Sequence, residues 1–352
     1  KRSMSSQTNP DRASRPQIPE ALIDGDLLPA TRGFFDGEWF VEEGNGAVRF
    51  GVRVEGLLHE EQSRFQKISV YESAFLGRML VLDDTLMLAE RDEFVYHEML
   101  VHVPLLSIPE PTSVLIIGGG DCGCLREVLK HDCVERVVQC DIDERVTDVC
   151  SRYFSWVNEA RSDSRAELVY EDGATFLDKS AADFDLVIVD STDPRDMAVG
   201  LFLRRFYRRV STSLKSGGVM AAQTESPHWN AGMVGAIYAE IAAAFREVSS
   251  YLGMVPTYPS GCWSFAYASE SRLPADFFDA ARAESLAGTC LYYRPGLEKA
   301  VFVLPGFAAD AIEGKNPFEG FDRRLYRSVR QELPSGGRGG GDDEPPGSTP
   351  ER

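Results

Sequence analysis

The chain lacks any run of 18 apolar residues, the length that a membrane-spanning helix needs. Residues 1–17 also lack the apolar core of a secretory signal peptide, so we expect a cytoplasmic protein without a membrane partner. Basic side chains are the minority, because 37 Lys and Arg stand against 55 Asp and Glu and give a formal net charge of −18. This charge disfavours nucleic acid and anionic lipid as partners and favours cationic ligands, although acidity can also serve solubility alone.

Cysteine pairs with metal-ligand spacing are also missing. The seven cysteines include no C-x-x-C pair with matching histidines, and their number is odd, so the sequence indicates neither a zinc site nor a disulfide framework. We expect most of these thiols to be reduced and buried as small apolar groups. With 352 residues, the chain is long enough to bury the cores of one large domain and a smaller one.

One stretch has the pattern of a nucleotide-binding turn. An apolar strand at Val114–Ile117 runs into Gly118–Gly123, which fits G-x-G-x-x-G, and a helix follows at Leu125–His131. A second strand at Val134–Cys140 leads into Asp141, at the position where such folds bind ribose hydroxyls. The stretch predicts a nucleoside site, and a tight turn without a ligand is the simpler alternative.

The hydrophobic pattern predicts two folded regions between two disordered tails. Short alternating runs within 31–90 indicate a small antiparallel β domain. Residues 91–331 begin with a helix and then alternate strands with helices, which is typical of a doubly wound, mainly parallel sheet. Residues 249–269 predict two antiparallel strands at its edge, joined by a proline-rich loop. The tails 1–30 and 332–352 lack periodicity.

Acidic residues follow the successive strands of this sheet. Asp121, Asp141, Asp172 and Asp190 each come at or near a strand's carboxyl end, the edge where open α/β sheets bind ligands. Asp141 suits a ribose diol, and Asp172 suits an amino group such as that of adenine. Asp121, inside the glycine turn, would repel a pyrophosphate or an amino-acid carboxylate and attract an ammonium.

A second acidic pair, Asp190 and Asp193, lies in the motif VDSTDP, and the preceding helix supplies Tyr96 and Glu98. An alkyl amine has a pKa of about 10 by analogy with lysine, so it must lose a proton before it acts as a nucleophile. A nearby carboxylate can bind the amine as a cation and then accept that proton. The simpler alternative is that Asp190 caps a turn and Asp193 begins a loop.

Four motifs, RDEFVYHEMLVHVPL, VLIIGGGDCGCLREVLKH, VIVDSTDP and PTYPSG, resemble in order and separation those of the polyamine aminopropyltransferases, the family of spermidine synthase. The resemblance covers Trp39–Pro305. It implies a small N-terminal β domain ahead of a methyltransferase-like Rossmann domain, in a homodimer or homotetramer. It also implies transfer of the aminopropyl group of decarboxylated S-adenosylmethionine to an amine, by default putrescine. Methylthioadenosine would be released, and neither a metal nor a tightly bound cofactor would be required.

The same resemblance implies roles for individual residues. Asp190 would accept the proton of the amine, with Tyr96 beside it as a catalytic residue. The acceptor amine would be lined by Tyr96, Asp190, Asp193, Gln223 and Tyr258. The donor would be held by Gln66, His97, Gly118, Gly120, Asp121, Asp141, Asp172 and Gly173, with Asp121 at its ammonium.

The chain departs from the family pattern at four places. Cys122 stands where the turn usually has a glycine, which strains the backbone if φ is positive there. Asp141 replaces the usual Glu, Met87 replaces a frequent Gln, and the loop 195–200 lacks a frequent Gly-Pro. These changes leave the reaction type intact. They leave the acceptor open among putrescine, cadaverine, agmatine and a triamine.

Three other functions compete with this interpretation. An S-adenosylmethionine methyltransferase would use the same sheet, but Asp121 would then face the methionine carboxylate. A polyamine-binding protein without turnover would need no base, whereas Asp190, Asp193 and Tyr96 are all present. A nicotinamide dehydrogenase lacks support, because no hydride-transfer histidine or Tyr-Lys pair accompanies the turn.

Overall fold

The computed structural model describes residues 34–318 except 36, 45–47 and 195–197. The two predicted tails, 1–30 and 332–352, lie outside the described residues, as does half of the loop 195–200. In the described part of the chain, no helix is both long and apolar enough to cross a membrane. All seven cysteines are free thiols, and four of them are buried.

Seven short strands form two antiparallel sheets before residue 90, as predicted. They are β1 (Phe34–Phe35), β2 (Trp39–Gly44) and β3 (Val48–Arg53) in the first sheet, and β4 (Gly56–Gln62), β5 (Lys67–Ser73), β6 (Gly77–Leu82) and β7 (Thr85–Ala89) in the second. The inner strands β5 and β6 of the second sheet contribute side chains to two cores, because successive residues of a strand point to opposite faces. Val70 and Leu80 join the core around the next helix, whereas Tyr71 and Met79 pack with Phe40 of the first sheet.

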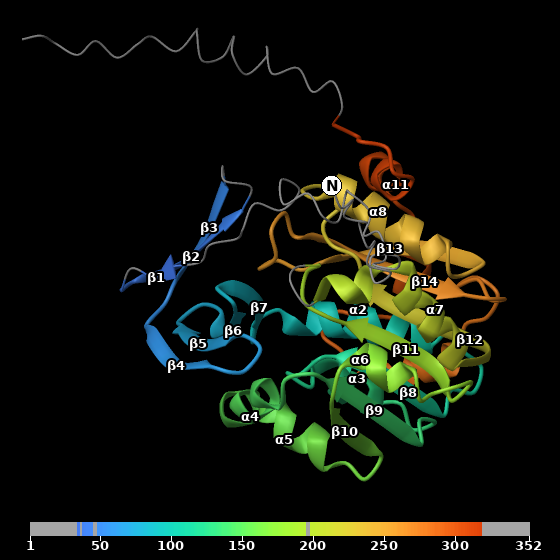
Figure 1. Cartoon of the computed structure of the whole chain (residues 1–352), viewed down its shortest axis with the longest axis horizontal. Coiled ribbons are helices and arrows are strands. Elements are labelled where there is room, and N and C mark those ends of the chain that lie inside the picture. The colour runs from blue at the N-terminus through green and yellow to red at the C-terminus, as the bar shows by residue number, and fades with distance from the viewer. Residues whose placement is uncertain (1–33, 36, 45–47, 195–197, 319–352) are drawn as a thin grey trace, which may run out of the picture. The chain divides into compact units, whose positions relative to one another are not determined.

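A seven-stranded sheet with the order β10-β9-β8-β11-β12-β14-β13 organises the rest of the described chain (Figure 1). Its strands are β8 (Ser113–Gly118), β9 (Arg136–Asp141), β10 (Ala166–Tyr170), β11 (Phe184–Asp190), β12 (Leu214–Gln223), β13 (Glu247–Met254) and β14 (Cys262–Ser269). Strands β8 to β12 pair in parallel, and β14 runs antiparallel to both of its neighbours. The predicted doubly wound, mainly parallel sheet is therefore confirmed.

Helices fill the connections between these strands. The described helices are α2 (Glu93–Leu105), α3 (Gly123–Leu129), α4 (Glu144–Tyr153), α5 (Ser155–Ser162), α6 (Gly173–Leu177), η2 (Ala198–Phe202), α7 (Arg204–Ser213), α8 (Ala231–Ala242), α9 (Ala280–Leu286), α10 (Leu297–Ala300) and α11 (Gly306–Ile312). The sequence pattern does not predict α5 and α6. These helices have eight and five residues, too few for a 3.6-residue period to stand out.

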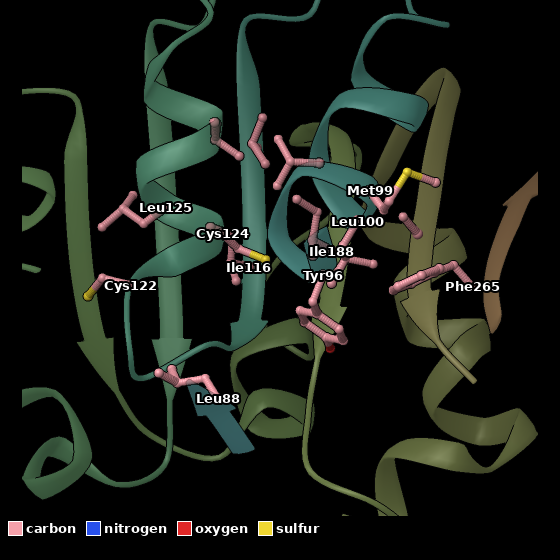
Figure 2. Packing of buried hydrophobic residues seen from close by; sticks show 14 of the residues in the cluster. Leu88, Tyr96, Met99, Leu100, Ile116, Cys122, Cys124, Leu125, Ile188 and Phe265 are labelled. Carbon is pink, nitrogen blue, oxygen red and sulfur yellow. The ribbon is translucent and has the colours of Figure 1, made fainter. Parts of the chain in front are cut away.

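The central strands divide their side chains between two cores. Val114 and Ile116 of β8 pack with α2, α3, α4 and α5, whereas Leu115 and Ile117 pack with α6, α7 and α8. Because both faces are covered, β8 has a continuous apolar sequence. Figure 2 shows Ile116 between the side chains of α2 and α3, with Tyr96 at one end of the cluster. This packing fixes the carboxyl ends of β8 and β11, where polar side chains gather.

Glu98 supports the fold and does not join Asp190. Its buried carboxylate accepts hydrogen bonds from three successive backbone N–H groups, those of Leu291 at 2.8 Å, Tyr292 at 2.9 Å and Tyr293 at 2.7 Å. The expectation that Glu98 accompanies Tyr96 into the acidic pair is therefore wrong. The two residues are only two apart on α2, and side chains at that spacing leave a helix on different sides.

We expect Glu98→Ala to lower the free energy of unfolding by about 3 kcal/mol or more. Three backbone donors would lose a charged acceptor, and hydrogen bonds to charged groups contribute about 1.5 to 3 kcal/mol each. Urea unfolding followed by circular dichroism measures the loss. The matched control is Glu284→Ala on α9, where the acid is exposed and the change should stay within about 0.5 kcal/mol. Equal unfolding midpoints for the two variants would contradict this role.

Candidate active site

The carboxyl ends of β8 and β11 bring the glycine turn against Asp190. The strands pair with Gly118 opposite Asp190, and the Gly119 N–H donates to the Asp190 carbonyl oxygen at 2.9 Å. Gly118 has a φ of 87°, and a Cβ at this position would collide with that same oxygen. Only glycine fits both conditions. Gly118 therefore sets how closely the loop that carries Asp121 approaches Asp190.

Asp190 is held by Tyr96 through one oxygen only. The Tyr96 hydroxyl donates to Asp190 Oδ1 at 2.8 Å, whereas Asp190 Oδ2 is buried and has no hydrogen-bond partner among the described residues. Burial and the charge of Asp121 raise the pKa of Asp190. Burial next to Asp190 also raises the pKa of Tyr96 well above its usual range, so the phenol stays a donor. The carboxylate thus has one fixed oxygen and a second one able to take up a proton.

Asp121 lies at the end of a chain of four buried or half-buried charges. Arg126 binds Glu93 through two nitrogen atoms, at 2.8 and 2.9 Å. Glu93 Oε2 lies 2.6 Å from His97 Nδ1, and His97 Nε2 lies 3.3 Å from Asp121 Oδ1. Burial disfavours the imidazolium, but the charges and hydrogen bonds of Asp121 and Glu93 outweigh burial and raise the pKa of His97 to about 10. At Asp121 burial is again the largest single effect, but His97, the Gly123 N–H and the charge of Arg126 together outweigh it and lower the pKa of Asp121.

The glycine turn leaves room for the His97 ring beside Asp121. A Cβ at Gly123 would collide with the His97 ring, and the Gly123 N–H donates to Asp121 Oδ1 at 2.7 Å. Cys122 before it has a φ of 59°, in the left-handed region. The strain expected for a side chain at this position is therefore present, and it costs about 1 to 2 kcal/mol. The turn tolerates this strain while it places Asp121 beside His97.

Asp141 lies at the end of β9, next to Gly120 of the turn. Its Oδ1 accepts the Asp143 N–H at 2.8 Å. Burial and the charges of neighbouring carboxylates raise the pKa of Asp141 to about 6. Gln66 does not contact Asp141. Its Nε2 donates to Asp143 Oδ2 at 3.1 Å, and Ser63 Oγ donates to the same oxygen at 2.7 Å, so this turn between β4 and β5 is tied to the start of α4.

Asp172 and Gly173 begin helix α6 after β10. Asp172 is the N-cap, and its Oδ1 accepts hydrogen bonds from the Thr175 N–H at 2.8 Å and the Thr175 hydroxyl at 3.0 Å. Gly173 packs on β8, since a Cβ there would lie 2.6 Å from Ile117 Cγ2. Both residues therefore have a role in the strand-to-helix turn itself, as capping patterns predict. Any contact with a ligand would be additional.

The Tyr258 side chain lies beside that of Tyr96. The two ring centroids are 5.8 Å apart, and the Tyr258 hydroxyl donates to the Met87 backbone oxygen at 2.6 Å. Because this bond uses the backbone, the exchange of Gln for Met at position 87 leaves it unchanged. Gln223 is the last residue of β12, and its side-chain amide donates to the Ser191 backbone oxygen at 3.2 Å. Asp193 lies three residues beyond the end of β11 and is half-buried.

The sequence analysis misses a residue, Asp92, that holds the loop of Tyr258 in place. The buried carboxylate of Asp92 accepts the Thr257 N–H at 2.8 Å and the Thr257 hydroxyl at 2.8 and 3.0 Å. The contact ties the loop of Tyr258 to the start of α2, which carries Tyr96. Asp92 precedes a helix and has the pattern of an ordinary N-cap, so no local signal reveals a partner 165 residues away.

In the described part of the chain, two groups of side chains have ligand atoms close enough for a metal. They are His97, Cys124 and Asp190 at the site, and His102, Glu127 and Cys290 away from it, each with ligand atoms within 4.8 Å of one another. In the first group, two carboxylates favour the imidazolium of His97, which has no lone pair for a metal. In the second, the Glu127 carboxylate already faces Arg126 and Lys130, each at 2.6 Å. The site therefore suits an organic cation better than a metal ion.

The raised pKa of Asp141 predicts a stability effect in the unliganded protein. The pKa rises from an ordinary 3.8 to about 6, so the protonated carboxyl stabilises the fold below pH 3.8, and this stabilisation is lost as the pH rises through about 6. Asp141→Asn keeps an acceptor for the Asp143 N–H. It should gain stability relative to wild type between pH 4 and pH 7, on the order of 2 kcal/mol.

Thermal unfolding at both pH values measures this gain. Asp132→Asn, which removes an exposed acid, controls for the general loss of a negative charge. A stability difference between Asp141→Asn and wild type that is the same at pH 4 and pH 7 would contradict the raised pKa.

Known protein families match the chain along most of its described length. The family model of the spermine/spermidine synthase domain matches residues 93–278, and that of the spermidine synthase tetramerisation domain matches residues 38–90. The chain is 37% identical over 278 residues to a polyamine aminopropyltransferase of Clostridium beijerinckii, with 78% of this chain and 98% of the relative covered. It is 42% identical over 272 residues to that of Desulforudis audaxviator, with 77% and 98% covered.

Solved structures agree with these relatives. A spermidine synthase in complex with the transition state analogue AdoDATO is 38% identical, with a TM-score of 0.76 over 79% of this chain and 96% of that chain. The spermidine synthase of Thermotoga maritima is 36% identical, with a TM-score of 0.73 over 79% and 95%. The expected methyltransferase-like fold is thus confirmed. The chain belongs to the spermine/spermidine synthase family and is an aminopropyltransferase of the spermidine synthase type.

Proposed function

We propose that this enzyme transfers the aminopropyl group of decarboxylated S-adenosylmethionine to putrescine, which gives spermidine and methylthioadenosine. The observation that carries the proposal is a pair of half-buried carboxylates with opposite pKa shifts at one sheet edge. The pKa of Asp121 is lowered beside His97, and the pKa of Asp190 is raised. A lasting negative charge suits the ammonium of the donor, and a carboxylate of raised pKa suits a proton acceptor.

The donor would lie across three consecutive strand ends. β8, β9 and β10 are neighbours in the sheet, and Asp121, Asp141 and Asp172 follow them in that order. We assign the donor's ammonium to Asp121, its ribose diol to Asp141 and the adenine amino group to Asp172. The remaining donor-binding residues in this proposal are Gln66, His97, Gly118, Gly120 and Gly173. A solved relative in complex with AdoDATO supports a site for a molecule of this kind.

The reaction is a displacement at the carbon next to the sulfonium. The amine nitrogen forms a bond to this carbon while the carbon–sulfur bond breaks, and the electron pair of that bond leaves with sulfur as a neutral thioether. The proton lost by the nitrogen goes to Asp190 Oδ2. Tyr96 donates to the other oxygen at 2.8 Å, which leaves Oδ2 to accept the proton. Alignment and deprotonation are the contributions that such a site makes to the rate.

Putrescine fits as the acceptor because it carries two ammonium groups. Asp190 would bind the attacking end, and Asp193, Gln223 and Tyr258 would line the remainder. Mass spectrometry of products from decarboxylated S-adenosylmethionine with putrescine, cadaverine, agmatine or spermidine tests this assignment. Spermidine as the dominant product supports it. A stronger product from another amine would correct the acceptor, and donor binding without any product would favour a polyamine-binding protein.

We also propose that β1 to β7 mediate a homodimer or homotetramer. Residues 38–90 match a tetramerisation domain, and the side chains of Trp39, Leu57 and Leu58 are about 40% exposed in the single chain, at 42%, 40% and 38%. Large apolar groups at a surface mark interaction sites when they are contiguous. Light scattering after size-exclusion chromatography measures the mass. The cytoplasmic location remains a prediction from the sequence.

Asp190→Asn should lose about 10² to 10⁴-fold in turnover, the range that a general base contributes. The amide keeps an oxygen that can accept from Tyr96, so the fold and the donor site should survive. Steady-state kinetics gives the loss, and methylthioadenosine affinity is the internal control, since that product makes no contact with the proton acceptor. Turnover close to wild type would contradict the role of Asp190.

Asp121→Asn should weaken decarboxylated S-adenosylmethionine about tenfold or more beyond any effect on methylthioadenosine, because only the donor carries the ammonium. Calorimetric titration with both ligands measures the difference. Asp141→Asn is the matched control, since its ribose contact is shared and both ligands should weaken alike. Equal weakening in Asp121→Asn would mean that Asp121 supports the turn alone.

A further inference from the structure

Asp121 is linked through His97 to a second ion pair, that of Glu93 with Arg126. Arg126 grips Glu93 with two hydrogen bonds, a bidentate geometry that fixes both partners. Its guanidinium also contacts Glu127 at 2.6 Å and lies 5.1 Å over the ring of Trp156. Trp156 in turn donates to the Asp121 backbone oxygen at 3.0 Å. Arg126 and Glu93 are therefore held in place by several contacts, and Glu93 directly contacts His97, one of the residues assigned to the donor.

Both ring nitrogens of His97 face carboxylate oxygens. Nδ1 lies 2.6 Å from Glu93, and Nε2 lies 3.3 Å from Asp121. An ionised carboxylate only accepts hydrogen bonds, so only the imidazolium can donate on both sides. The other groups around the ring are the Cys124 thiol and the Asp190 carboxylate, which are near enough to share a ligand, and the Tyr96 ring at 5.3 Å. Among the residues that the structure describes, no Lys or Arg forms an ion pair with the ring, and Arg126 is paired with Glu93.

We propose that Glu93 and Arg126 are positioning residues for the transfer reaction, which hold His97 as a protonated ring against Asp121. The inference rests on the proposed roles of Asp121 and Asp190. The charge of His97 opposes burial at both carboxylates, since it lowers the pKa of Asp121 and limits the rise of the pKa of Asp190. Loss of the imidazolium would therefore let both carboxylates take up protons at a higher pH.

The test is Glu93→Gln, which keeps the size of the side chain and an acceptor oxygen but removes its charge. Because the chain has only five histidines, NMR of histidine-labelled enzyme can follow His97 directly. We expect the pKa of His97 to fall by about 1 to 3 units, the usual effect of losing an opposite charge at this distance. The acid limb of the pH profile of kcat/KM should move to higher pH.

Glu127→Gln is the matched control, since it removes a carboxylate from the other side of Arg126 without touching His97. It should cost stability but leave the His97 titration and the acid limb in place. Glu93→Asp keeps the charge and should restore part of both. If Glu93→Gln does not fold, Arg126→Lys, which loses the two-point contact, should shift both readouts in the same direction by less.

Two results would overturn the inference. An unchanged His97 titration in Glu93→Gln would mean that Glu93 only supports the fold. A lowered His97 pKa with an unmoved acid limb would mean that the ring does not act on the reacting carboxylates. Failure of the proposed function would look different, because Asp121→Asn and Asp190→Asn would then behave like wild type while the His97 titration in Glu93→Gln still shifted.

Discussion

Three half-buried carboxylates, those of Asp121, Asp141 and Asp190, lie at one edge of the sheet, and the free energy of their ionisation determines what the site can bind. Asp121 forms an ion pair with His97 at 3.3 Å, and its pKa is lowered. Burial raises the pKa of Asp141 and of Asp190, and at Asp190 the charge of His97 offsets only part of this rise. A ligand that brings a positive charge relieves this repulsion, whereas a phosphate or carboxylate would add to it. This arrangement therefore favours ligands that carry a positive charge.

Helix α2 connects this electrostatic site to the rest of the fold. Tyr96 and His97 are neighbours on the helix, and their side chains reach Asp190 and Asp121 at the ends of two different strands. Asp92 binds the Tyr258 loop before the helix starts, and Glu98 clamps the segment after α9. A helix that is buried along most of its length thus fixes both acids at once. Small shifts of α2 would therefore change the surroundings of Asp190 and Asp121 together.

The sequence predicts the parts of this account that depend on local pattern. Strand periodicity and the glycine turn predict Asp121, Asp141, Asp172 and Asp190 at one edge of a parallel sheet, and the structure has that sheet. Local pattern does not predict contacts between distant segments, such as the hydrogen bonds between Asp92 and Thr257.

Helix phase and side-chain reach also exceed what a pattern reveals. The expected position of Glu98 next to Asp190 fails because residues two apart on a helix point in different directions. Gln66, which we expect to hold the donor, donates to Asp143 in the unliganded structure, and nothing in the sequence spacing reveals this contact.

The most direct test of these electrostatic interactions is calorimetric binding of decarboxylated S-adenosylmethionine against S-adenosylmethionine itself. We expect the decarboxylated form to bind at least about tenfold more tightly, because the carboxylate of S-adenosylmethionine would approach Asp121. Equal affinities, or tighter binding of S-adenosylmethionine, would contradict it.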